Sequence, residues 1–115
     1  MSVAPSTLRR RLLSEMRKTV LAMMSPRWDL ALEGKTRDEV TKAARTLLAM
    51  QRARLRLGNA ELAEIRDQLK AKEQDLLSGI EALQRSRKKL ANVKSVLAAA
   101  TALTNIVGRI VGLVA

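Results

Sequence analysis

The feature that most constrains this chain is a leucine repeated every seven residues. Eight leucines keep one phase along the second half of the sequence: Leu48, Leu55, Leu62, Leu69, Leu76, Leu83, Leu90 and Leu97. A seven-residue apolar repeat keeps one seam of a helix turned toward a partner helix, as in a left-handed coiled coil. We therefore predict one long helix from residue 37 to at least residue 97, which self-associates along these eight leucines as an oligomer interface.

The positions that follow each leucine by three residues support this prediction less well, because polar residues and glycines occur among them where a coiled coil needs apolar residues. They are Gln51, Gly58, Ile65, Lys72, Gly79, Ser86, Val93 and Ala100. Gly58 and Asn59 can end one helix and start another, and Ser78 with Glu81 can form a capping box. The alternative is a helical hairpin or a three- or four-helix bundle broken near Gly58 and Gly79. A loop would reset the leucine phase, so the unbroken phase favours the long helix.

Composition supports an all-α fold throughout the chain. The apolar residues are mostly Leu, Ala and Met, which are strong helix formers, while Phe and Tyr are absent and Trp28 is the only aromatic residue. Pro5 and Pro26 are the only prolines, so nothing after Pro26 forbids helix. The 115 residues suffice for one domain.

Four segments follow from these patterns. Residues 1–25 form a basic amphipathic helix, and residues 26–36 form a connector in which Trp28 is a packing anchor. Thr36 and Glu39 form a capping box that starts the next helix. Residues 37–92 form the leucine-repeat coiled-coil helix, and residues 93–115 form an apolar C-terminal helix.

The C-terminal segment carries a wide apolar stripe that must be covered by protein or by lipid. Its residues are Val93, Val96, Ala100, Leu103, Val107, Ile110, Val111 and Val114. Residues 95–108 are 14 uncharged residues in a row, which is shorter than the roughly 20 that span a bilayer. Packing against other helices is the first interpretation, and membrane contact is the second.

The net charge of +11 would attract an anionic partner, whether nucleic acid, anionic lipid or an acidic protein. Most of the excess lies in the first 60 residues, where thirteen basic residues face five acidic ones. The candidate contacts are Arg9, Arg10, Arg11, Arg52, Arg54, Arg56, Arg85, Arg87, Lys88 and Lys89. An anionic membrane and non-specific nucleic acid both fit these clusters, because a basic surface does not choose between them.

The residue types indicate a function without catalysis. Cys and His are absent, which removes thiolate chemistry, imidazole acid–base chemistry and the usual zinc ligands. We expect no enzyme activity, no cofactor and no small-molecule substrate. The leading hypothesis is an interaction or scaffold protein that self-associates within a larger assembly. A peripheral or C-terminally anchored membrane-associated protein and an electrostatic nucleic-acid-binding protein are the alternatives. Charged residues interrupt the apolar positions of the N-terminal segment, so we expect a cytoplasmic protein, with membrane association under the second hypothesis.

Overall fold

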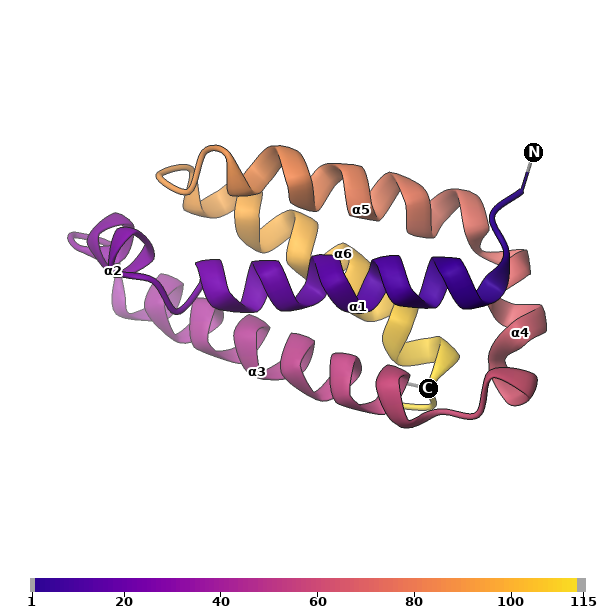
Figure 1. Ribbon diagram of the computed structural model, residues 1–115. Helices are drawn as coiled ribbons and strands as arrows, with labels where there is room; N and C mark the ends of the chain where they lie inside the picture. The colour runs from indigo at the N-terminus through magenta and orange to yellow at the C-terminus, as the bar shows by residue number, and fades with distance from the viewer. Residues whose placement is uncertain (1, 114–115) are drawn as a thin grey trace.

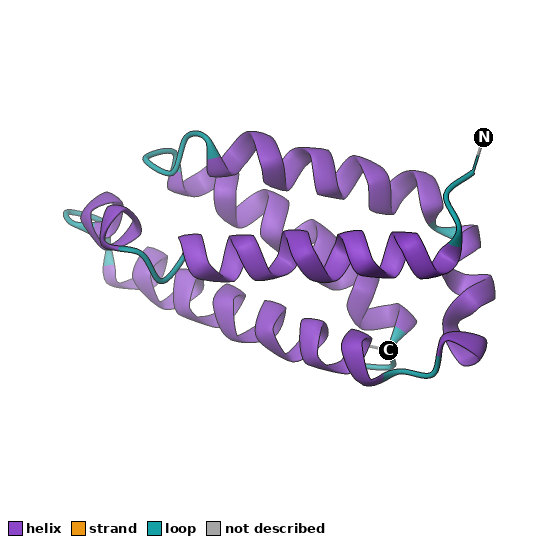
Figure 2. Cartoon of the chain, viewed as in Figure 1, coloured by secondary structure: helices purple, strands orange, loops and turns teal. Residues whose placement is uncertain are grey.

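The computed structural model describes residues 2–113, and these residues form six α-helices joined by turns (Figures 1 and 2). The helices are α1 (Pro5–Ala22), α2 (Pro26–Leu32), α3 (Arg37–Asn59), α4 (Leu62–Ala71), α5 (Glu73–Arg87) and α6 (Val93–Ile110). The all-α prediction is therefore confirmed for the described residues.

Four long helices build the bundle, and each runs antiparallel to the one before it in the chain (Figure 1). Helix α1 packs against α3 and α5, and α6 packs against the same two helices from the other side. The short helix α2 lies at one end, where α1 leads to α3, and α4 lies at the opposite end, between α3 and α5. The two antiparallel neighbours α1 and α3 thus form one side of the molecule.

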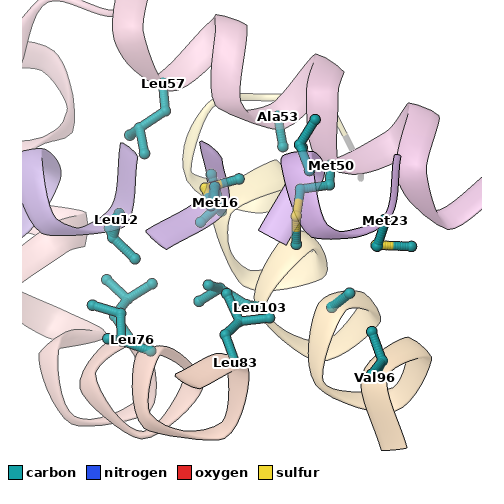
Figure 3. Packing of buried hydrophobic residues seen from close by; sticks show 14 of the residues in the cluster. Leu12, Met16, Met23, Met50, Ala53, Leu57, Leu76, Leu83, Val96 and Leu103 are labelled. Atoms are coloured by element: carbon teal, nitrogen blue, oxygen red, sulfur yellow. The ribbon is translucent and has the colours of Figure 1, made fainter. Parts of the chain in front are cut away.

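The core is aliphatic and rich in methionine. Figure 3 shows side chains from α1, α3, α5 and α6 converging, among them Leu12 and Met16 of α1 and Leu76 and Leu83 of α5. All four of these side chains are fully buried. Burying one leucine or methionine contributes about 1.5–3 kcal/mol relative to leaving it exposed. The apolar stripes of four helices, rather than one seam of one helix, supply the buried area.

The prediction of one long coiled-coil helix from residue 37 to residue 97 is wrong. Helix α3 ends at Asn59, α4 begins at Leu62, and a turn at residues 88–92 separates α5 from α6. Arg9 of α1 donates a hydrogen bond from Nη1 to the carbonyl oxygen of Ala60 at 2.7 Å, which fixes the first of these turns against α1. The chain folds back on itself, and its own helices bury five of the eight leucines: Leu69, Leu76, Leu83, Leu90 and Leu97.

The alternative prediction of a broken bundle is right about Gly58 and wrong about Gly79. Gly79 lies inside α5, where a Cβ atom would come within 2.8 Å of Leu103 Cδ1 on α6. This glycine permits the close approach of α5 and α6, so it marks a tight contact between two helices and not the end of a helix. Asn92 instead caps the start of α6, because its side chain accepts a hydrogen bond from the Ser95 amide at 3.2 Å.

The predicted capping box at the start of α3 is confirmed. Thr36 Oγ1 accepts a hydrogen bond from the Glu39 amide at 3.2 Å, and the Glu39 side chain accepts one from the Thr36 amide. The connector before it is more ordered than predicted, because it contains α2 with Ser25 as its N-cap. Trp28 is only 2% exposed, so this ring packs into the end of the core.

Candidate interaction surface

The structure divides the leucine repeat into an exposed part and a buried part. Leu48 and Leu55 on α3 are 49% and 65% exposed, and Leu62 is half-buried. The remaining five are buried within the chain: Leu69, Leu76, Leu83, Leu90 and Leu97. Of the eight leucines predicted as an oligomer interface, only Leu48 and Leu55 present a large apolar area to another molecule.

The apolar stripe of α6 also faces the chain's own core. Val93, Val96, Ala100, Leu103, Val107 and Ile110 are buried, Val111 is half-buried, and Val114 lies outside the described residues. Helix α6 is long and apolar enough to cross a membrane by length and composition, but half of its 18-residue window is buried inside the chain. A core helix of a globular bundle has the same length and composition, and the packing of α6 between α3 and α5 gives it that role here.

The contact between α1 and α3 sets which of their residues lie side by side at the surface. A Cβ atom on Gly58 of α3 would lie 3.7 Å from Leu13 Cδ2 of α1, so these two positions mark the seam between the helices. Residues three, four, seven or eight positions away along a helix lie on nearly the same side. Such steps lead from Leu13 to Arg17 and Leu21, and from Gly58 to Leu55 and then to Leu48.

We call the resulting surface the α1–α3 face. It consists of five exposed apolar side chains and three exposed arginines, which lie on α1, on α3 and, for Met24, in the turn after α1: Leu21, Met24, Val40, Leu48, Leu55, Arg10, Arg17 and Arg52. Among the residues that the structure describes, six large apolar side chains are exposed, and Leu30 on α2 is the one outside this face. The exposed apolar area is therefore gathered on one side of the bundle.

Charge is gathered on the same two helices. Helix α1 together with residues 40–59 of α3 carries ten basic residues and one acidic residue, Glu15, which is buried. Residues 62–87, which cover α4 and α5, carry five basic and five acidic residues. Like charges that are not neutralised by neighbours give a positive potential over the surface. The α1–α3 face is thus both apolar and cationic.

The ten cations predicted to contact an anionic partner do not form one site. Arg10, Arg11, Arg52 and Arg56 are exposed on α1 and α3. Arg85, Lys88 and Lys89 line a hollow of about 610 Å³ between α5 and α6. Arg9, Arg54 and Arg87 are half-buried, and Arg9 and Arg87 are held by hydrogen bonds within the chain.

Arg87 is part of a partly buried polar cluster that joins α5 to α1. Its Nη2 atom lies 2.5 Å from Glu15 Oε2, its Nη1 atom donates to Thr19 Oγ1 at 3.0 Å, and Gln84 Nε2 donates to Glu15 Oε1 at 3.1 Å. Burial raises the pKa of the Glu15 carboxyl, but the hydrogen bonds from Arg87 and Gln84 and the charges of Arg87 and Lys18 outweigh it, so the pKa lies below its ordinary value. Both oxygens of this carboxylate have partners within the chain, so the cluster acts as a clamp between two helices.

The sequence pattern missed the α1–α3 face because it assigned Leu48 and Leu55 to a seam with a partner helix. The available signal was charge: residues 40–60 contain no acidic residue, whereas the exposed positions of a coiled-coil helix usually carry charges of alternating sign. Leu21, Met24 and Val40 gave no separate signal, since each is a single apolar residue in a helical stripe.

The fold and this surface define an all-α bundle with one cationic, apolar side. No family model, no curated protein and no solved structure matches the chain.

Proposed function

We propose that this chain is a non-enzymatic interaction protein that binds an anionic partner through the α1–α3 face. One observation carries the proposal: five exposed apolar side chains lie among arginines on α1, on α3 and in the turn after α1. The acidic residues of these two helices are Glu15, which is buried, and Asp38 and Glu39, which are confined to the first turn of α3. Large apolar patches on a protein surface mark sites that another molecule covers.

The positive charge of the α1–α3 face indicates what kind of molecule covers it. Two copies of the chain joined through this face would bring Arg17 and Arg52 against the same arginines of the other copy. Like charges brought together at an interface oppose association. A partner with negative charge would instead neutralise these arginines while covering Leu48 and Leu55, so it uses both properties of the surface.

Retention on a heparin column, where the bound polymer is a polyanion, tests the position of the binding surface. The variant Arg17→Glu/Arg52→Glu reverses two charges on the face, and Arg66→Glu/Lys70→Glu reverses two exposed charges on α4. Both variants change the net charge equally. We expect the face variant to elute at a much lower salt concentration than the α4 variant, because binding to a polyanion follows the local density of cations. Equal elution of the two variants would contradict the proposal, since it would show that net charge alone drives retention.

A further inference from the structure

We propose that the anionic partner is the surface of a lipid bilayer containing acidic lipids, on which α1 and α3 lie flat. This inference rests on the proposed function and names the partner of the same face. The shape of the face, the kind of side chains it exposes and the buried position of Trp28 support a bilayer as the partner.

The shape of the α1–α3 face fits a planar surface. The two helices have 18 and 23 residues and lie side by side, so at 1.5 Å per residue they extend over about 27 and 35 Å (Figure 1). A docked helix from another protein needs a groove between two helices. None of five hollows of about 150–610 Å³ is lined by α1. Helix α3 lines hollows on its α6 side, and Arg52, at the edge of the face, lines one of about 200 Å³ there.

The side chains on the face are those that bind at a bilayer interface. Leucine and methionine side chains enter the boundary between headgroups and acyl chains, while arginine stems lie along the apolar surface and their guanidinium groups stay among the phosphates. Each basic residue near an acidic membrane adds to the attraction. Arg17 lies one turn from Leu21, and Arg52 lies between Leu48 and Leu55, so both helices present this mixture.

Nucleic acid would contact the arginines of this face but would leave its apolar side chains uncovered. Single strands are bound by cations together with aromatic rings on which the bases stack, and duplexes are bound through contacts to phosphates. Trp28 is the only aromatic residue of the chain, and it is buried at the end of the core. Five exposed aliphatic side chains have no role in phosphate binding, whereas a bilayer would bury them.

Co-sedimentation of the full chain with vesicles tests the inference. We expect binding to vesicles of equal parts phosphatidylcholine and phosphatidylglycerol, and much weaker binding to phosphatidylcholine alone. The matched pair Leu55→Ser and Leu30→Ser separates the face from the rest of the surface, because these leucines are 65% and 67% exposed but Leu30 lies on α2. We expect Leu55→Ser to lower the partition coefficient several-fold and Leu30→Ser to leave it nearly unchanged, while Leu48→Ser/Leu55→Ser should lower it about tenfold or more. The substituted side chains are exposed, so unchanged circular dichroism and thermal melting are expected for all variants.

The outcomes distinguish the lipid inference from the proposed function. Equal effects of Leu55→Ser and Leu30→Ser on vesicle binding would overturn the inference. Absence of vesicle binding, together with heparin retention that depends on Arg17 and Arg52, would overturn the bilayer as partner and leave the proposed function standing. Tighter binding to soluble poly-L-glutamate than to acidic vesicles, with the same dependence on Leu55, would instead identify an acidic protein. Binding to none of these probes would overturn both.

Discussion

The two parts of the leucine repeat have the same spacing and opposite environments. Leu48 and Leu55 on α3 are about half or more exposed, whereas Leu69 on α4 and Leu76 and Leu83 on α5 are completely buried. The difference arises between them, where the chain turns at residues 60–61 and bends again at Lys72. After the turn, the leucine side of α4 and α5 faces the core, while on α3 the buried positions are held by Met50, Leu57 and smaller residues. A heptad spacing thus defines a stripe along each helix, and the turns decide whether that stripe meets the core or the solvent.

The largest expected effect is the difference in stability between a substitution at a buried leucine and the same substitution at an exposed one. Leu76→Asp places a carboxylate in the core, and we expect a loss of about 4 kcal/mol or more in the free energy of unfolding, which is most of the stability of a small domain. Leu48→Asp changes an exposed residue, and we expect a change within about 0.5 kcal/mol. Urea denaturation followed by circular dichroism measures both, with light scattering to record the molecular mass. A loss of similar size for Leu48→Asp, with a reduced mass, would show that Leu48 is buried in an oligomer.

The next effect concerns the clamp between α1, which carries part of the exposed face, and α5, which carries buried leucines. Glu15→Gln removes the charge that neutralises the largely buried Arg87, and we expect a loss of about 2–3 kcal/mol. The pKa of Glu15 is lowered in the folded state, so its ionised form contributes stability at pH values above the unfolded-state pKa. That contribution is lost as the pH falls through the folded-state pKa.

Acid titration of stability checks this assignment. The wild-type chain should lose free energy of unfolding toward low pH, and Glu15→Gln should lose less of it over the same range. Glu64→Gln, at an exposed site on α4, is the control and should leave the pH dependence nearly unchanged. Parallel curves for wild type and Glu15→Gln would show that the Glu15–Arg87 pair does not contribute to acid sensitivity.

The smallest expected effect comes from substituting one glycine on α3, which carries the exposed leucines, and one on α5, which carries buried leucines. Gly58 is near the end of α3, where an added Cβ meets only Leu13 at an ordinary contact distance, so Gly58→Ala should stabilise the chain by up to about 1 kcal/mol through helix propensity. Gly79 lies under Leu103, which is completely buried, so the crowding in Gly79→Ala should exceed the same propensity gain and destabilise by about 1 kcal/mol. Thermal denaturation measures both variants, and we expect the melting temperature to rise for Gly58→Ala and to fall for Gly79→Ala. A stabilising Gly79→Ala would show that Leu103 repacks freely.

Several parts of this fold follow from the sequence without its tertiary structure. Apolar residues that are mostly Leu, Ala and Met, with no proline after Pro26, leave helix as the available state, and the Thr36–Glu39 capping box placed the start of α3. The excess of positive charge before residue 60 was also visible, because charge depends on composition alone. These are local properties: a cap involves residues three apart, and helix propensity is a property of single residues.

The path of the chain, and with it the candidate site, was decided by tertiary structure. Gly58 and Gly79 look alike in the sequence, yet the chain turns after one and packs tightly against Leu103 at the other, because the choice depends on a helix that arrives later in the chain. Whether Leu48 or Leu76 is buried depends in the same way on where α1 and α6 come to lie. Burial is a sum over contacts between distant segments, so the heptad period determined which leucines share a helix face, and only the packed bundle determined which of them meets the solvent.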